Sequence, residues 1–511
     1  MLLEAVRPPA WRDMPLSAAA ADVGVLARLL DHIEHKAPGI DSILVARGQD
    51  VLFDCTFAPW PRDRAHPIYS CTKTILGLLI GIAIDKHLIG GLDDAIYPLL
   101  RPGRRAGLEP ARAAITIRHL LTMTSGLATE DYGGSFNGYF NMLSHRDLVE
   151  RTLDLPLRAA PGEAFHYNNA GSHLLACILR NATGVSVLDF AREHLFGPLG
   201  IEDAAWDENR EAGVTGWSGL SLRPRDLAKI GRLYLDGGLW GDRRIVSQAW
   251  VDASVRGHVE AKPHGRYGLH WWVEPDLFMG VGHFGQYLVA IPGEDLVIVI
   301  NSSLQPGEML LPKYLVRTYM LPAFAGGAGC DDDPFGVAEV GAKLARARQP
   351  KAANRFVWHD EARGVGQDGV FERAAAPRVR FRYPPRALRA KLTSPSQIAA
   401  LNTFESFPVF AFINNVPPGV RLEDAGGLYA EALRTFGKAE RFDVRSNAPL
   451  QLADGTPAYR TDIRYRFEGS MTINAVVVSA FRDGKWVCIE GHTPGDPAEM
   501  AVIAESMTFD V

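Results

Sequence analysis

Two pairs of short apolar runs, far apart along the chain, predict two β-hairpins. The first pairs residues 41–46 with residues 51–55. The second joins residues 287–291 to residues 296–300 through the turn Pro292 to Asp295. The strands of the second hairpin are apolar at nearly every position, which is typical of strands in the middle of a covered sheet.

The pattern between the hairpins is mostly helical. An apolar run from Ile75 to Ile84 falls short of the ~20 residues of a bilayer-spanning helix and predicts a buried core helix. Residues 225–236, opened by Pro224, predict a second helix, and Val187 to Phe196, capped by Ser186, predict a third. Strands at both ends with helices between them predict an α/β domain, with an antiparallel sheet flanked by helices and a helical insertion.

A change of composition predicts a second domain. Ala325 to Pro334 is rich in glycine and aspartate, which is typical of a linker. At 511 residues the chain is too long for one ordinary domain. We therefore expect a first domain at residues 1–325, a linker region at 326–375 and a second domain at 376–511.

The second domain is predicted to be α+β. Apolar and polar side chains alternate from Tyr459 to Phe467, which indicates a half-exposed strand. Met471 to Phe481 and Trp486 to Glu490 continue an antiparallel meander, and a terminal helix is expected around Pro497 to Ser506. In element order alone this part resembles the PsbP-type sandwich. We find no catalytic constellation in it, so its role stays open.

Composition and charge exclude several classes of function. The formal net charge is −5, the pI is near 6.3, and Lys and Arg are dispersed, so we expect no nucleic-acid partner. The first residues lack a basic region followed by an apolar core, which predicts no secretory signal, no membrane partner and a cytoplasmic protein. The five cysteines are scattered without metal-type spacing, so we expect reduced, structural thiols and no metal or cofactor.

Ser70 and Lys73 stand three residues apart where a polar turn enters the apolar run. Positions i and i+3 share a helix face, so the amine is expected beside the hydroxyl at the first turn of a buried helix. A desolvated lysine loses its charge readily and can take the proton of a serine, which makes the serine nucleophilic. The alternative is a helix start with a lysine that reaches back to solvent.

Two later segments favour catalysis. Phe165 to Asn169 supplies a Tyr-x-Asn triplet, and Gly282 to Gln286 supplies a His-x-Gly triplet between two apolar strands. The order of the three motifs resembles the serine β-lactamase-like superfamily, most of all class C β-lactamases, family VIII carboxylesterases and 6-aminohexanoate-dimer hydrolases. Three further phrases over the first 320 residues look similar to that family: residues 116–127, 195–201 and 225–231.

The resemblance implies a β-lactamase/transpeptidase-like fold in two parts with the site in the cleft between them. It implies that Tyr167 relays a proton to the leaving group, although a half-buried core tyrosine is the commoner fate of the residue type. It implies that Asn169 binds Lys73 and substrate, although asparagine in such a turn is often only a backbone cap.

Backbone groups complete the predicted site. The amides of Ser70 and Gln286 are expected to form an oxyanion hole. We also expect Gly285 and Gln286 to lie on an edge strand where substrate adds as a further strand, with Phe284 beside it. His283 departs from the β-lactamase pattern, which usually has lysine there, and a histidine with a pKa near about 6.5 is mostly neutral at pH 7. Anionic β-lactams are therefore expected to be poor substrates.

These observations predict a serine hydrolase that cleaves a small carboxylic ester or linear amide through an acyl-enzyme. The alternatives are a β-lactamase or D-amino-acid peptidase and, from a different class, a noncatalytic ligand sensor that uses the same pocket. The number of subunits stays open. Four aromatic residues are expected either to line the pocket or to belong to the core: Phe136, Tyr139, Trp271 and Trp272.

Overall fold

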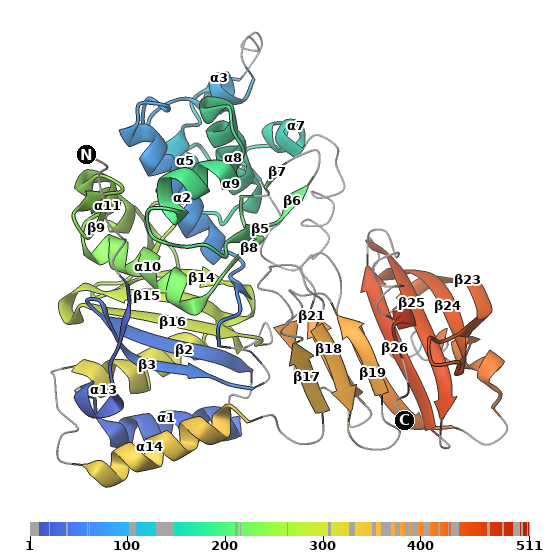
Figure 1. Ribbon diagram of the computed structural model, residues 1–511. Helices are drawn as coiled ribbons and strands as arrows, with labels where there is room; N and C mark the ends of the chain where they lie inside the picture. The colour runs from blue at the N-terminus through green and yellow to red at the C-terminus, as the bar shows by residue number, and fades with distance from the viewer. Residues whose placement is uncertain are drawn as a thin grey trace, which may run out of the picture. The chain divides into compact units, whose positions relative to one another are not determined.

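A computed structural model of the chain divides into two compact units, which we describe separately (Figure 1). The first consists of residues 1–56, 62–302 and 306–345, and the second of residues 57–61, 303–305 and 346–511. The structure describes residues 10–19, 21–36, 39–58, 60, 62–101, 109–128, 148–209, 213–214, 216–262, 264–304, 308–325, 333–349, 354–358, 369–373, 379–383, 388–389, 397–402, 409–416, 420–427, 429–430, 439–467, 471–482, 485–493, 501, 504–507 and 509.

The first unit is built on a nine-stranded sheet in the order β1-β3-β2-β16-β15-β14-β13-β12-β11. The strands are β1 (Arg12–Asp13), β2 (Ile40–Arg47), β3 (Asp50–Thr56), β11 (Val259–Glu260), β12 (Arg266–Tyr267), β13 (Trp272–Val273), β14 (Phe278–Gly282), β15 (Gln286–Ile291) and β16 (Leu296–Ser302). All neighbours are antiparallel except β1 and β3. Both predicted hairpins are present, and β2 pairs with β16, with Val45 opposite Ile298. The two ends of the domain therefore meet in one sheet, which confirms the predicted α/β architecture.

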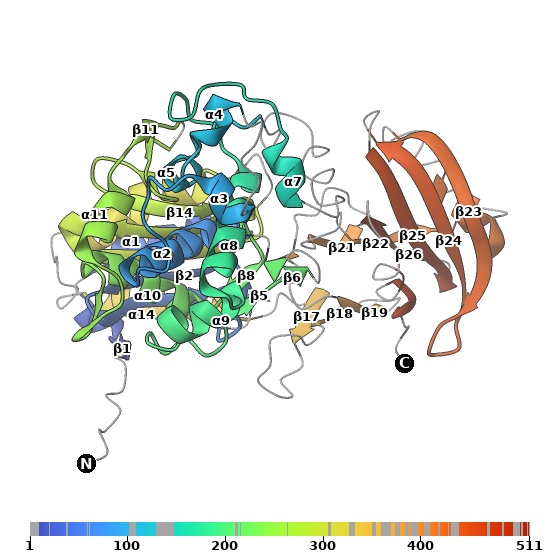
Figure 2. The same ribbon diagram turned by 90° about the horizontal axis from the view of Figure 1, so that it is seen from above.

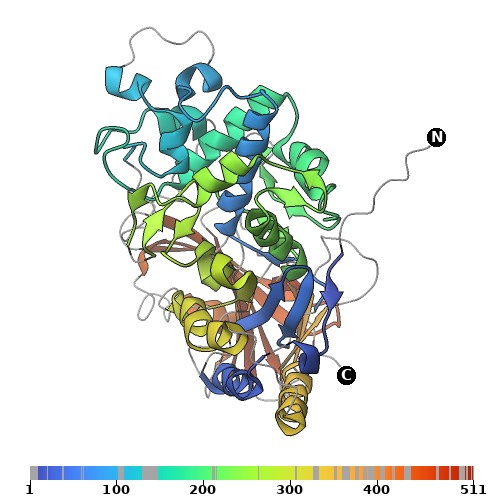
Figure 3. The same cartoon turned by 90° about the vertical axis from the view of Figure 1, so that its left-hand side faces the viewer.

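Helices cover both faces of this sheet. In Figure 1, α10 (Pro224–Leu235) lies on one face, and α1 (Val23–Lys36), α13 (Leu321–Phe324) and α14 (Pro334–Ala347) lie on the other. The inserted helices lie together on the α10 side, away from α1 and α14 (Figure 3). They are α2 (Cys71–Asp85), α3 (Ile96–Leu100), α4 (Pro110–Ala113), α5 (Ile117–Leu121), α7 (Leu148–Leu153), α8 (Asn169–Thr183), α9 (Val187–Ala191) and α11 (Gln248–Val255).

Helix α2 is the buried core helix that the sequence predicts. Thirteen of its residues are buried, including all of the run from Ile75 to Ala83. Gly81 admits the ring of Trp250, because a Cβ at this position would lie 2.3 Å from it. A side chain there would push α11 away, so glycine permits the close packing of the two helices.

The second unit contains two sheets within its described residues. The larger has the order β20-β21-β22-β26-β25-β24-β23, and its long strands lie side by side in Figure 2. The strands are β20 (Leu388–Arg389), β21 (Gln397–Asn402), β22 (Val409–Asn415), β23 (Ala439–Gln451), β24 (Pro457–Phe467), β25 (Met471–Arg482) and β26 (Lys485–Thr493). The smaller sheet joins β17 (Asn354–Trp358), β18 (Gly369–Arg373) and β19 (Val379–Tyr383).

The meander of the second domain is confirmed by β24, β25 and β26, but two features differ from expectation. Strand β23 completes the sheet although its polar sequence gave no strand pattern. The predicted linker region 326–375 holds helix α14 and strands β17 and β18, so it is not a simple linker. Of the expected terminal helix, residues 501, 504 and 505 are helical. The domain boundaries and the PsbP-type likeness stay predictions.

The structure also bears on the expected reduced thiols and on the expectation of a buried core helix in place of a bilayer-spanning one. Cys55, Cys71, Cys177 and Cys488 are free and buried, and Cys330 lies outside the described residues. In the part of the chain that the structure describes, no single helix is long and apolar enough to cross a membrane, although α8 and residues 187–196 meet the requirement as a pair bent by 76°.

Candidate active site

Ser70 stands at the start of α2, at the end of a tightly wound turn. Its neighbour Tyr69 has φ of 45°, in the left-handed region that non-glycine residues seldom adopt. Ser70 is the N-cap residue, with its backbone already helical, and the Lys73 amide donates to its carbonyl at 3.1 Å. Ser70 is half-buried, whereas the next ten residues are buried. The hydroxyl therefore lies where the buried helix reaches accessible space.

Lys73 is 1% exposed, and its amine lies within hydrogen-bond distance of oxygen atoms from Ser70, Asn169 and Trp217. Nζ lies 3.0 Å from Ser70 Oγ, 2.6 Å from Asn169 Oδ1 and 3.0 Å from the Trp217 carbonyl oxygen. The amide and carbonyl oxygens can only accept, so each takes one N–H. A neutral amine has two N–H groups, and its lone pair then faces the Ser70 hydroxyl. This geometry suits proton transfer from Ser70 to Lys73.

Tyr167 lies against the same amine. Lys73 Nζ is 4.9 Å from the centroid of the Tyr167 ring, within the range of a cation–π contact. Trp272 stacks on the same ring with an interplanar angle of 9° and centroids 6.1 Å apart. The stacked indole fixes the plane of the phenol beside the amine.

Asn168 and Asn169, at the start of α8, bind different partners. The side chain of Asn168 caps the helix by accepting from the Gly171 amide at 2.8 Å. Asn169 is therefore not needed as the cap, and its amide oxygen binds Lys73 instead. The alternative interpretation of Asn169 as a backbone cap is wrong, because Asn168 caps the helix.

The His-x-Gly triplet forms a short 3₁₀ turn, His283–Gly285, between β14 and β15. The rings of Tyr69 and Phe284 meet edge to face with centroids 5.1 Å apart, and a Cβ at Gly282 would lie 2.4 Å from the Ile68 carbonyl oxygen. The turn therefore lies directly beside the segment that leads into Ser70. All three motifs come together.

Gln286 is the first residue of β15 and is fully buried. Its side chain donates to the Ser302 carbonyl at 2.6 Å and accepts from Asn301 Nδ2 at 3.2 Å. Its carbonyl lies 3.6 Å from Cys71 Sγ, at the start of α2. These contacts fix the backbone of residue 286 relative to the helix of Ser70, and its role in an oxyanion hole stays a prediction.

The expectation of an edge strand is wrong. Strand β15 lies between β14 and β16, and Gln286 is paired with Gly282 of β14. Beyond β14 the sheet continues through β13, β12 and β11. These last three strands have two residues each, which is too short for an alternating pattern to be recognised in the sequence. Strand β15 therefore offers no free edge at Gln286, and the place of the substrate stays a prediction.

His283 carries no charge at neutral pH. Burial lowers its pKa to about 4, and its ring packs against the Phe284 ring with centroids 4.1 Å apart. A permanent cation is thus missing from this position, as the sequence predicts.

The aromatic candidates separate into three groups. Trp271 is fully buried and contacts Tyr234 and Phe278 edge to face, so it belongs to the core. Trp272 is half-buried and lies beside Tyr167. Phe136 and Tyr139 lie outside the described residues.

Two participants were missed by the sequence reasoning. The carbonyl oxygen of Trp217 accepts from Lys73, and a backbone group carries no residue-type signal. His270 contacts the backbone of Lys73, and no motif marks it. Its detection requires the fold, since 197 positions separate the two residues.

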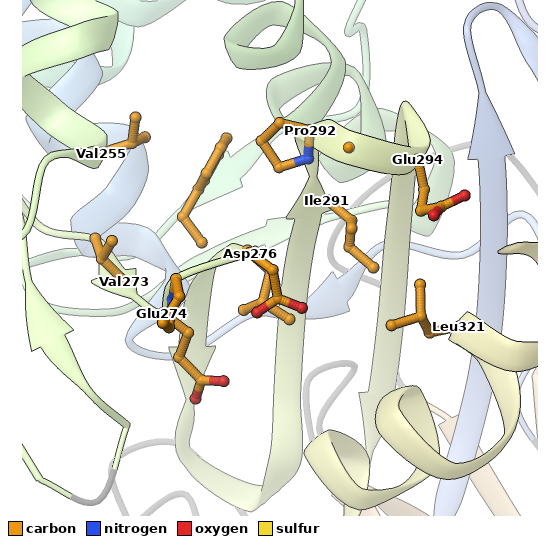
Figure 4. A pocket seen from close by; sticks show the side chains of 12 residues that line it. Val255, Val273, Glu274, Asp276, Ile291, Pro292, Glu294 and Leu321 are labelled. Atoms are coloured by element: carbon orange, nitrogen blue, oxygen red, sulfur yellow. The ribbon is translucent and has the colours of Figure 1, made fainter.

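A separate pocket of about 450 Å³ lies at the opposite ends of β14 and β15 (Figure 4). It is lined by Val255, Val273, Glu274, Pro275, Asp276, Leu277, Phe278, Ile291, Pro292, Gly293, Glu294 and Leu321. Arg317 binds both Glu274, at 2.6 Å, and Asp276, at 2.8 Å. This pocket contains none of the motif residues, and two of its carboxylates are already paired. Among the described residues, no cluster of His, Cys, Asp and Glu suits a metal.

The chain matches one family model and is similar to several known proteins. The family model described as Beta-lactamase matches residues 24–317. Over 291 residues the chain is 30% identical to the 6-aminohexanoate-dimer hydrolase of Paenarthrobacter ureafaciens, covering 52% of this chain and 72% of that protein. Over 162 residues it is 26% identical to the lovastatin esterase of Penicillium rubens, covering 30% and 37%. A solved penicillin-binding protein from Bacillus halodurans is 16% identical with a TM-score of 0.46, covering 57% of this chain and 99% of that one.

Proposed function

The chain belongs to the beta-lactamase family, and from the contacts of Lys73 we propose that it is a serine hydrolase acting on a small carboxylic ester or linear amide. The observation that carries the proposal is the buried amine 3.0 Å from Ser70 Oγ, with its other contacts to oxygens that can only accept. A 6-aminohexanoate-dimer hydrolase and a lovastatin esterase are among its relatives, so both kinds of bond remain candidates.

The proposed reaction has two stages. Lys73 takes the proton of Ser70 as the Ser70 oxygen attacks the substrate carbonyl carbon, and the amides of Ser70 and Gln286 stabilise the oxyanion. Tyr167 gives its own proton to the leaving group, whose departure leaves an acyl group on Ser70, a phenolate at Tyr167 and a protonated Lys73. Water then attacks the acyl group, the Tyr167 phenolate takes a proton from it, and Lys73 returns its proton to the Ser70 oxygen as the acid leaves.

Two features support an uncharged substrate. His283 is neutral where a cation would hold a substrate carboxylate, and its neighbour Phe284 is apolar. Gly285 presents no side chain at the turn and has φ of 86°. We therefore place the acyl or leaving group of a neutral ester or amide over residues 283–285. Four buried free thiols are in keeping with a reducing compartment, and residence in the cytoplasm is part of the proposal.

The deciding experiment labels the nucleophile. After incubation with a phosphonate that transfers its phosphonyl group to a serine nucleophile, the peptide that contains Ser70 should gain the mass of the phosphonyl group, and Ser70→Ala should abolish both the label and ester turnover. The matched control is Ser247→Ala, which removes another serine at a helix start, the cap of α11. An unlabelled Ser70 in an active enzyme would refute the mechanism. Labelling without turnover on any ester or amide would favour the ligand sensor.

A further inference from the structure

His270 occupies a buried position between the first turns of the two helices that carry the site. It is 2% exposed and follows Leu269 in the segment before β13. Its Nδ1 lies 2.9 Å from the carbonyl oxygen of Lys73, in α2. Its Nε2 lies 3.3 Å from Ser172 Oγ, in α8, three positions after Asn169. One imidazole thus links the backbone of Lys73 to the helix that supplies the partner of its amine.

The partners determine which nitrogen carries the proton. A backbone carbonyl can only accept, so Nδ1 carries the hydrogen and donates it to the Lys73 oxygen. Nε2 then has a lone pair and accepts from the Ser172 hydroxyl, which can donate. Burial, together with the nearby charge of Lys73, lowers the pKa of His270 to about 3, so the ring stays neutral over the working range. Both bonds are therefore kept in a single tautomer.

The backbone of His270 is held in an uncommon conformation. Its φ is 61°, in the left-handed region. Its amide donates to the Leu121 carbonyl at 3.0 Å, and its own carbonyl accepts from Thr74 Oγ1 at 2.9 Å. Gly77 gives room for it, because a Cβ there would lie 3.3 Å from the His270 Cβ. Backbone outliers that the surroundings hold on both sides tend to occur at functional sites.

We propose that His270 is a positioning residue of the hydrolytic site: by binding the Lys73 carbonyl and Ser172 together, it fixes the distance between the Lys73 amine and Asn169. The inference rests on the proposed function. It adds a residue that touches neither substrate nor Ser70 and acts through the placement of the base. Lys73 must meet three oxygens from three segments at once, so small displacements of α2 against α8 disturb proton transfer.

Four variants test this role. His270→Leu removes both bonds at similar size. His270→Asn keeps a donor near the Nδ1 position and tolerates a positive φ. Ser172→Ala removes only the link to α8. The matched control is Ser254→Ala, another fully buried serine whose hydroxyl donates to a helix carbonyl, that of Trp250, at 2.7 Å.

The readouts are the rate of Ser70 labelling by the phosphonate, kcat, KM and Tm. His270→Leu should lower the labelling rate and kcat by about 10–100-fold with little change in KM, the size expected for a displaced catalytic group. His270→Asn should recover most of this loss, and Ser172→Ala should lose less than His270→Leu. Ser254→Ala should keep its labelling rate even where its Tm falls.

The inference is overturned if His270→Leu labels within threefold of the wild type, or if His270→Asn is as slow as His270→Leu. If His270→Leu does not fold, the comparison of Ser172→Ala with Ser254→Ala decides: equal labelling rates overturn it. Failure of the proposed function looks different, because the wild type itself would then not be labelled at Ser70.

Discussion

Replacing Lys73 by methionine should remove most of the activity and leave stability almost unchanged. Methionine retains most of the side-chain length and deletes the amine. The bonds lost from Asn169 Oδ1 and the Trp217 carbonyl contribute about 0.5–1.5 kcal/mol each. Removing a polar amine that is 1% exposed relieves a desolvation penalty of about 1–3 kcal/mol. The free energy of unfolding should therefore change by less than about 2 kcal/mol, while loss of a positioned base lowers kcat by about 10²–10⁴-fold.

Lys229 offers a matched control with the opposite signature. It is 9% exposed, and its amine binds Asp226 Oδ1 at 2.7 Å and the Gly200 carbonyl at 2.8 Å. Lys229→Met leaves the carboxylate of Asp226 buried without this partner, which should lower the free energy of unfolding by about 3 kcal/mol. Its kcat, measured on a p-nitrophenyl ester well below Tm, should equal that of the wild type.

Denaturant unfolding and ester kinetics on both variants separate the two roles. The reasoning is refuted if Lys73→Met loses as much stability as Lys229→Met and keeps its kcat. In that case Lys73 is an ordinary buried lysine at a helix start.

Two further predictions follow from the neutral histidines. In a panel of p-nitrophenyl esters, linear amides and a chromogenic cephalosporin, ester or amide turnover should exceed that of the cephalosporin, because neutral His283 offers no cation for its carboxylate; a cephalosporin that ranks first contradicts this. Burial lowers the pKa of His264 and His283 to about 4 and that of His270 to about 3. The stability that these neutral rings contribute is therefore complete above about pH 6.5, the pKa of an unperturbed histidine, and is lost as the pH falls through 4. Denaturant unfolding should show this loss, with a slope of up to about 4 kcal/mol per pH unit, and a flat profile from pH 7 to 4 would contradict it.

The sequence predicted correctly those elements whose burial can be recognised from their own run of apolar residues. Helix α2 is covered on every side, and residues 74–84 are accordingly apolar at nearly every position, which the sequence alone shows. Strands β15 and β16 are likewise buried along their whole length, and their sequences are apolar at nearly every position. Ser70 and Lys73 meet because helical spacing alone brings them to one face.

Features that depend on distant segments were missed or misjudged. Strand β15 was taken for an edge strand, but it pairs with β14 on one side and β16 on the other, and beyond β14 the sheet continues through two-residue strands without a pattern. The Trp217 carbonyl reaches Lys73 across 144 positions through a backbone atom, which any residue type could supply. His270 belongs to none of the sequence motifs, and only the fold brings its ring to the Lys73 carbonyl.

Strained backbone conformations also occur around the proposed site at Ser70, and this observation does not depend on any sequence motif. Among the described residues, six other than glycine have positive φ, and four of them surround Ser70 and Tyr167. Tyr69 precedes Ser70, Phe284 packs against Tyr69, and His270 binds Lys73. The fourth, Met123, accepts a hydrogen bond from the amide of His166, next to Tyr167.

Conformations of this kind cost about 1–3 kcal/mol each, so the four together approach the ~5–15 kcal/mol stability of a whole domain. They persist only where packing and hydrogen bonds leave no alternative, as the two backbone bonds of His270 illustrate. A core that needed only to be filled would carry no such penalty. The concentration of this cost around Ser70 and Tyr167 is what we expect if the position of the proposed reacting groups, and not stability, determines the local structure.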